Sequence, residues 1–417
     1  MSELSNVYAR RNVTSLGVTD TGDGTTLLII NIPSNYGHRL TNPFVLSLAE
    51  AEAMDITEEK DAANDCLFWE HIKDFYSFSN EGVKLYLYVY TITKPMNEIF
   101  LFGDTDPIMH YVREKEDIKM IVLAQNPFRD NPPTKSVQDE LLLTLPMVEI
   151  FQQKLFDIGL PVAAVFLEGR YFSGAASAAV DLSEYNSGNT TVVISRDADR
   201  RKVLQSKGIT KALYYAQVCL PPGKLSSIPV NHNFGRTSNH VTGETEPLPM
   251  QNSELSNVAP RTYTIADMGI LSAYRYVFSM KYTDFAGNYF VEEHTCTKPG
   301  KSNSRVSYNR VMVKAARLVR KAGLRALKSQ VTVDKQTGFM ISSDRIDLKE
   351  KMEKSVKDQM LNNPDPSRLP EISSVGVIID PAQKILSTNS LTVSVEIVPT
   401  ASLSVIKIDL SIVNPGS

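Results

Sequence analysis

The sequence has few cysteines, no long apolar run and no large excess of charge of either sign. Its three cysteines, Cys66, Cys219 and Cys296, are too few and too far apart for a disulfide framework or a metal-ligand motif, so we expect buried free thiols and no metal site. No apolar run approaches the roughly eighteen residues of a membrane-spanning helix, which predicts a soluble protein without membrane insertion. The formal net charge of −3 disfavours a nucleic-acid coat, because phosphate binding needs a basic surface.

The common catalytic signatures are also missing. The chain has no G-x-S-x-G elbow, no Walker A loop, no G-x-G-x-x-G after a strand and no H-E-x-x-H helix. We therefore expect no enzyme, no catalytic or cofactor-binding residue and no cofactor. An α/β enzyme stays an alternative, because catalytic groups meet in space rather than in sequence. Residues 1–12 show neither a secretory signal nor a lipidation motif, so we expect synthesis and assembly in the cytoplasm.

The N-terminal half alternates between strand and helix patterns. Strand patterns occur at residues 25–32, 83–92, 118–123, 162–167 and 191–194. Helical patterns lie between them, including one expected to start at Pro146 and one expected to stop at Pro221. Strands that alternate with helices predict a mainly parallel, layered α/β region.

The pattern changes in the C-terminal half. Residues 236–260 are rich in Asn, Ser, Thr, Gly and Pro, which is typical of a loop between domains. An α+β pattern follows, with a hairpin, a long helix and strands at 375–379, 392–398 and 405–412. We expect an N-terminal extended arm (1–24), an α/β domain (25–235), a linker loop (236–260), an α+β domain (261–404) and a C-terminal arm strand (405–417).

The long helix, expected from Ser307 to Lys328, carries two stripes. Its basic residues recur at three- and four-residue steps and so share one face: Arg310, Lys314, Arg317, Lys321, Arg325 and Lys328. An apolar stripe beside them is predicted to face the core: Val311, Ala315, Leu318 and Ala322. No acidic residue occurs from 298 to 328, so the basic stripe repels itself unless acidic groups or phosphates oppose it. It is either a solvated face or a docking surface in a subunit interface.

Two further segments are candidates for subunit interfaces. An acidic segment offers a counter-surface for the basic helix: Glu50, Glu52, Asp55, Glu58 and Glu59. The last strand pattern alternates along the C-terminal arm: Val405, Ile406, Lys407, Ile408, Asp409, Leu410 and Ile412. This strand either closes its own sheet or adds to the sheet of a neighbouring subunit, where each main-chain hydrogen bond contributes about 1 kcal/mol net.

Several short stretches resemble one protein family. Residues 309–317 of the basic helix look like the helix signature of a divergent contractile-tail sheath family, found as a domain of unknown function in phage and prophage tail clusters. Residues 378–383 and 395–399 are similar to the ending of the same family. Weaker similarities occur upstream, at residues 71–75, 167–170 and 233–236.

The resemblance implies a structural role. It implies subunits that form hexameric rings stacked helically around an inner tail tube protein, together with baseplate and terminator proteins, in a phage or phage-like particle assembled in the bacterial cytoplasm. It also implies that both arms exchange strands between neighbours. The particle is a bacteriophage tail, a tailocin or another contractile injection system. The alternatives are another tail or capsid structural protein, an α/β enzyme or a nucleic-acid-binding protein, although no specific nucleic acid is expected.

Overall fold

A single mainly parallel sheet forms the centre of the molecule. The computed structural model describes residues 21–36, 43–91, 94–100, 106–127, 133, 136–239, 242–257, 261–327, 329–362, 369–388, 390–400 and 402. The sheet has the order β2-β3-β1-β4-β5-β6-β9. Its strands are β1 (Thr26–Ile32), β2 (Phe44–Val45), β3 (Leu85–Thr91), β4 (Met120–Leu123), β5 (Ala164–Glu168), β6 (Thr190–Val193) and β9 (Tyr276–Val277). All neighbours pair in parallel except β2 with β3, which confirms the predicted layered α/β architecture.

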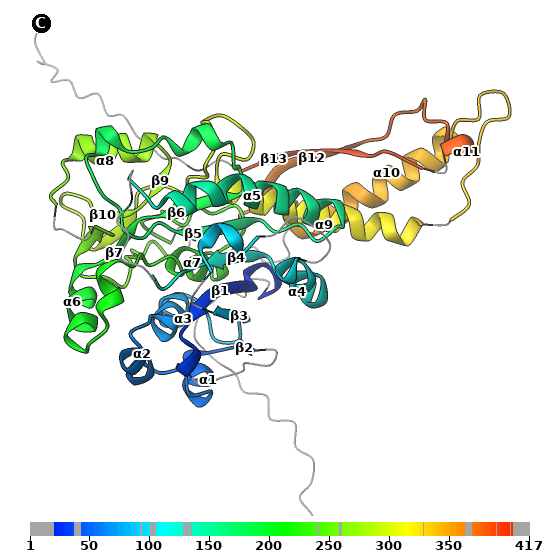
Figure 1. Ribbon diagram of the computed structural model, residues 1–417. Coiled ribbons are helices and arrows are strands. Elements are labelled where there is room, and N and C mark those ends of the chain that lie inside the picture. Colours follow the sequence, from blue (N-terminus) through cyan, green and yellow to red (C-terminus); the bar gives the residue numbers. More distant parts are fainter. Residues whose placement is uncertain are drawn as a thin grey trace, which may run out of the picture.

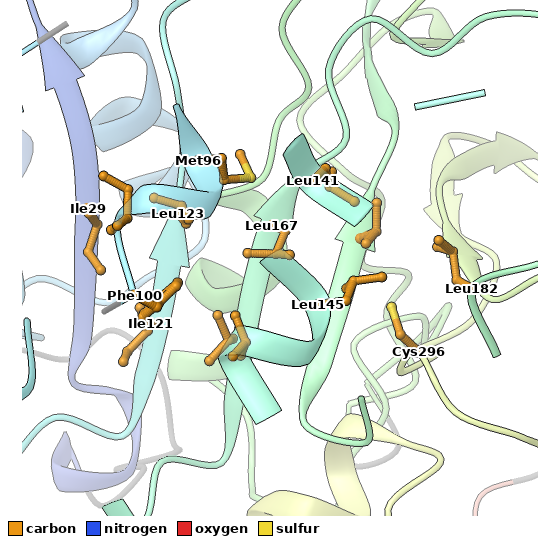
Figure 2. Close-up of a cluster of buried hydrophobic side chains, with 14 of the residues drawn as sticks. Ile29, Met96, Phe100, Ile121, Leu123, Leu141, Leu145, Leu167, Leu182 and Cys296 are labelled. Carbon is orange, nitrogen blue, oxygen red and sulfur yellow. The ribbon is translucent and has the colours of Figure 1, made fainter. Parts of the chain in front are cut away.

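Helices cover both faces of this sheet. Alternate residues of β1 enter two different cores: Leu27 and Ile29 pack on one side, Leu28 and Ile30 on the other. The first core includes α4 (Pro107–Lys115), α5 (Asp139–Asp157) and α8 (Ile265–Ala273), and part of it is drawn in Figure 2. The second includes α1 (Leu48–Ala53), α3 (Phe68–Tyr76) and α7 (Leu220–Ser226), with α2 (Glu58–Asn64) beside α3. Such two-sided burial explains the nearly continuous apolar runs of the strands.

Smaller elements complete this part of the chain. A two-stranded antiparallel pair joins β7 (Ser195–Asp197) to β8 (Ser253–Leu255), with α6 (Ala198–Ser206) following β7. The predicted hairpin is present as β10 (Ser279–Lys281) and β11 (Asn288–Phe290). Cys66, Cys219 and Cys296 are free and buried, as expected. Across the described ranges, no helix is both long enough and apolar enough to cross a membrane.

Two helix boundaries differ from the expectation, and both differences involve proline. Helix α5 begins at Asp139, so Pro146 lies inside it, on its exposed side. The helix expected to end at Pro221 is not formed: the stretch before it contains the 3₁₀ turn Thr210–Leu213, and α7 begins at Leu220. Pro221 is accommodated in α7 because prolines in a first turn lose only N–H groups that have no helical partner. Gly223 is required in α7 because a Cβ atom there would lie 2.3 Å from the carbonyl oxygen of Phe75 in α3.

The last third of the chain builds a projection with its own core. It contains α9 (Val306–Ala326), α10 (Ser342–Val356), a π-helical turn η7 (Lys357–Leu361), β12 (Ile372–Ile378), α11 (Ile385–Thr388) and β13 (Ser394–Pro399). Figure 1 shows α10 and the β12–β13 hairpin extending away from the sheet. The apolar stripe of α9 packs against α10, η7 and this hairpin, as predicted. The described part of this small sheet has two strands, in antiparallel register.

The predicted boundaries have different outcomes. Strand β9 joins β6, so the central sheet includes residues from both sides of the predicted linker at 236–260. The division of the chain into domains stays a prediction. Of the N-terminal arm, only Thr21–Gly24 is described, as the 3₁₀ turn η1 that leads into β1. The C-terminal arm residues Val405 to Ile412 lie outside the described residues.

Candidate functional site: the seam along helix α9

Helix α9 starts on a buried carboxyl group. Arg305, at the position before the helix, gives no side-chain cap. Instead Glu293, which is fully buried, accepts the backbone N–H of Ser307 at 3.0 Å and the hydroxyl of the same residue. Its backbone carbonyl accepts the N–H of Val306 at 3.2 Å. The first turn of the helix is therefore fixed to the segment that follows β11.

Arg310 points into the main body of the protein. Its side chain is 3% exposed and donates to the backbone carbonyls of Leu225 at 2.8 Å, Ile228 at 3.3 Å and Pro229 at 3.2 Å. These carbonyls lie at and just beyond the C-terminal end of α7, where the helix dipole favours a cation. Burial lowers the pKa of Arg310 to about 10, so the group stays charged at neutral pH. A guanidinium suits this position because its fork reaches several acceptors at once.

Lys314, one turn further along, bridges two carboxylates. Its Nζ lies 2.9 Å from Asp23 and 2.9 Å from Glu371. Asp23 precedes β1 and Glu371 precedes β12, so the two acids come from opposite ends of the described chain. Burial raises the pKa of Glu371, and Lys314 partly opposes that shift.

Arg317 continues the row toward the strands of the central sheet. It donates to the carbonyl of Ile118 at 3.0 Å and to that of Pro161. These residues lie just before β4 and β5. Arg320 reaches the end of α5, where a Cβ atom on Gly159 would lie 2.2 Å from its Nε atom. The first half of α9 thus runs past the amino ends of β1, β4 and β5 and holds the projection against them.

The basic stripe therefore divides into two halves. Arg310, Lys314 and Arg317 make the contacts described above within the chain, and an interface role for them stays a prediction. Lys321 and Arg325 are exposed, together with Leu324, which is 52% exposed. The side chain of Lys328 lies outside the described residues. An interface role for Lys321 and Arg325 stays a prediction.

The predicted acidic counter-surface lies elsewhere on the subunit. Figure 1 shows α1 and α2 at the far side of the central sheet from the free end of α9. Glu58 bonds within the chain to Arg200 at 2.9 Å and Lys207 at 2.9 Å. The other four acids are exposed: Glu50, Glu52, Asp55 and Glu59. The basic end of α9 and this surface do not meet in one subunit.

Two asparagines lie where α/β sheets usually bind ligands. In such sheets the ligand lies beyond the carboxyl ends of two strands whose connections leave in opposite directions, here β1 and β4. Asn31 and Asn126 fill this position and are joined by three hydrogen bonds of 2.5–2.8 Å. The Asn126 side chain also accepts the N–H of Leu67 at 2.9 Å. Both asparagines are buried, so their hydrogen bonds tie the carboxyl ends of the two strands together.

A buried polar group beside these asparagines also serves the fold. Glu168, at the end of β5, accepts the backbone N–H of Gln125 at 2.8 Å and that of Ala216 at 3.0 Å. The Nε2 atom of His71 lies 3.9 Å from it. Burial raises the pKa of Glu168 to about 7 and lowers the pKa of His71 to about 3. Glu168 thus joins the ends of two strands to the segment before α7.

Sequence reasoning missed most partners in this seam. The carbonyl groups that Arg310 and Arg317 bind have no residue-type signature. Asp23 and Glu371 are separated by most of the chain, so no local pattern connects them. The one available signal was the absence of acids from 298 to 328, which indicated that the basic stripe needs partners from elsewhere.

Comparisons with known proteins agree with this architecture. A family model described as DUF2586, C-terminal domain, matches residues 304–417. No curated protein sequence matches the chain. A structure of the anti-feeding prophage baseplate, 6-fold symmetrised, contains a similar chain, with TM-score 0.56, 10% identity and 99% coverage of both chains. A contracted sheath complex of an extracellular contractile injection system, PVC, is similar at TM-score 0.56 and 10% identity, covering 99% of this chain and 98% of the other.

A third structure, the anti-feeding prophage baseplate in the contracted state, gives TM-score 0.54 at 10% identity and covers 99% of both chains. At this level of identity the similarity establishes the fold, and it extends over the whole chain. The family match includes residues 309–317, 378–383 and 395–399, which carry the C-terminal resemblance, and the solved structures agree with the fold that the resemblance implies.

Proposed function

We propose that this chain, whose last part belongs to the DUF2586 C-terminal family and whose fold is that of contractile injection system proteins, is the sheath subunit of a contractile tail. The observation that supports this most strongly is the similarity to the PVC sheath complex, which covers 99% of this chain. In the proposed assembly, subunits form stacked hexameric rings around an inner tube. The sheath contracts to drive the tube through a target envelope.

The projection supports a role in linking subunits. The described part of its sheet has only two strands, so both β12 and β13 present an edge to which another strand can add. Val398 is 54% exposed on this hairpin and Ile378 is 49% exposed. We propose that the C-terminal arm, residues 405–417, and the N-terminal arm add strands to such sheets in neighbouring subunits. Several backbone hydrogen bonds per arm, at about 1 kcal/mol each, would then connect the polymer.

The separated charges support a second contact between copies. Lys321 and Arg325 form a basic surface at the free end of α9, and the acids of α1 and α2 form an acidic one. We propose that these surfaces meet between subunits in one state of the sheath. Exposed ion pairs contribute only about 0–1 kcal/mol each. A helical assembly sums this small term over many copies.

The proposed mechanism involves no covalent reaction. The extended sheath is a metastable minimum, and contraction releases conformational free energy once the baseplate frees it. The chain is accordingly not an enzyme in this proposal. Its partners are other copies of itself, the tube protein, and baseplate and terminator proteins. It is assembled in the bacterial cytoplasm and resides in a phage-like particle.

Electron microscopy of the purified full-length chain tests this proposal. Negative staining should show hollow, striated cylinders with six-fold end views. Closed shells or solid fibres would instead favour another tail or capsid structural protein. Binding to mixed DNA that weakens steeply with salt would favour the nucleic-acid alternative. A strictly monomeric protein under all assembly conditions would contradict the sheath function.

A further inference from the structure

We propose that Lys314 couples the attachment points of the two terminal arms, so that a displacement of one arm is transmitted directly to the other. The coupling is a property of one subunit, and its use in a sheath rests on the proposed function. It follows from how the two ends of the described chain converge on the first three turns of α9.

The N-terminal attachment point is η1 (Thr21–Gly24), the end of the N-terminal arm that leads into β1. Gly24 packs tightly on α7, since a Cβ atom there would lie 2.7 Å from the Cβ atom of Ser226. The backbone N–H of Thr26 donates to the carbonyl of Lys84 at 3.1 Å, and this is where β1 begins to pair with the chain that leads into β3. Asp23 reaches from this turn to Lys314 at 2.9 Å. The arm therefore emerges from a turn that is fixed to α7, β3 and α9 together.

The C-terminal attachment point is the base of the β12–β13 hairpin. The N–H of Thr400, just after β13, donates to the carbonyl of Glu371 at 3.4 Å, and the N–H of Glu371 donates to Met360 at 2.8 Å. The side-chain amide of Asn231 donates a hydrogen bond to the hydroxyl oxygen of Thr400 at 2.6 Å. Ser402 is the last described residue before the C-terminal arm, and its hydroxyl accepts a hydrogen bond from Arg305 at 3.2 Å.

Lys314 is the group that both attachment points share. Its side chain is 12% exposed, that of Asp23 is 21% exposed and that of Glu371 is 7% exposed. Attraction across such a partly buried site is screened far less than at the surface. If either carboxylate moves away, the Lys314 ammonium group keeps only one of its two ion pairs. The remaining ion pair must then change its geometry. Without the lysine charge, the two carboxylates would repel each other.

This arrangement gives a subunit a short connection between its neighbours. In a lattice where the two arms bind different copies, a pull on the N-terminal arm displaces Asp23. Through Lys314 and Glu371 the displacement reaches the hairpin base from which the C-terminal arm leaves. The path consists of three side chains, Asp23, Lys314 and Glu371, and does not need the central sheet to deform.

Hydrogen exchange on the monomeric full-length chain tests the coupling. The N–H of Thr26 reports on the N-terminal attachment point, and the N–H groups of Glu371 and Thr400 report on the C-terminal one. Asp23→Asn should raise exchange at the C-terminal reporters roughly threefold or more, and Glu371→Gln should do the same at Thr26, because each removes one charge that Lys314 needs.

Two further variants separate coupling from general loosening. Lys314→Met should raise exchange at both attachment points, and Lys314→Arg should restore most of the protection. Asp347→Asn is the matched control, because it breaks an exposed ion pair with Lys351 in the same projection but touches neither attachment point. Should Lys314→Met fail to fold, the reciprocal effect of Asp23→Asn still decides the question.

The outcomes separate this inference from the sheath function. If each carboxylate variant changes exchange only at its own attachment point, or no more than the control does, the coupling is refuted even when the wild-type chain forms cylinders. If the reciprocal effect is present in a chain that never polymerises, the coupling stands and the sheath proposal fails.

Discussion

Replacing Arg310 by Met tests how α9 is held to the main body. The guanidinium is 3% exposed and serves three backbone carbonyls. Each carbonyl left without a donor costs at least about 1 kcal/mol, while the removal of a buried charge returns part of that cost. We expect a loss of about 3 kcal/mol in the free energy of unfolding. Arg310→Lys should lose about half as much, because an ammonium cannot reach the same set of acceptors.

Urea unfolding followed by tryptophan fluorescence measures this loss. The single tryptophan, Trp69, lies in α3, which packs on α7, the helix whose end Arg310 binds. Arg325→Met is the control, since it removes a basic residue from the exposed end of the same helix and should change stability by less than about 0.5 kcal/mol. If Arg310→Met were no more destabilising than the control, the seam would not hold the projection as described.

Three further predictions follow from other parts of the structure. Reversing the charge of Lys321 and Arg325 to Glu should reduce cylinder formation, scored by electron microscopy, while urea stability changes by less than about 0.5 kcal/mol; normal cylinders would exclude a role for this surface. Gly24→Ala should lower stability by about 1–3 kcal/mol, because the added methyl group collides with Ser226, and an unchanged unfolding midpoint would contradict that packing. Burial and two neighbouring arginines lower the pKa of His294 from 6.5 to about 3, so the contribution of this group to stability is lost as pH decreases below 6.5, by up to about 1.4 kcal/mol per pH unit. The stability of His294→Gln relative to the wild type should therefore increase from pH 7 to pH 4 in urea titrations, a comparison in which the other buried groups cancel, and a constant difference would contradict this prediction.

Features that depend on neighbouring residues could be predicted from the sequence. The apolar stripe that includes Val311 and Ala315 lies against the core of the projection, because a stripe at helical spacing has to be buried. The strand patterns predicted the parallel sheet correctly because their apolar residues also have to be buried. Pro146 was misread as a helix start because local preference for the first turn does not exclude an exposed position inside a helix.

Features that depend on residues far apart in the chain could not be predicted from the sequence. The stripe of α9 is uniform in sequence, yet Arg310 is buried and Arg325 is exposed, because only the first half of the helix lies against the central sheet. The same residue type therefore serves two surroundings. Lys314 finds its partners, Asp23 and Glu371, through the topology of the whole chain.

The most direct test of the sheath function compares the full-length chain with one that ends at Ser402. Both are induced to assemble and are examined by sedimentation and negative-stain electron microscopy. If terminal strands join the subunits, the full-length chain forms hollow striated cylinders, while the shortened chain stays in small species with unchanged urea stability. Cylinders of normal length and diameter from the shortened chain would contradict the account.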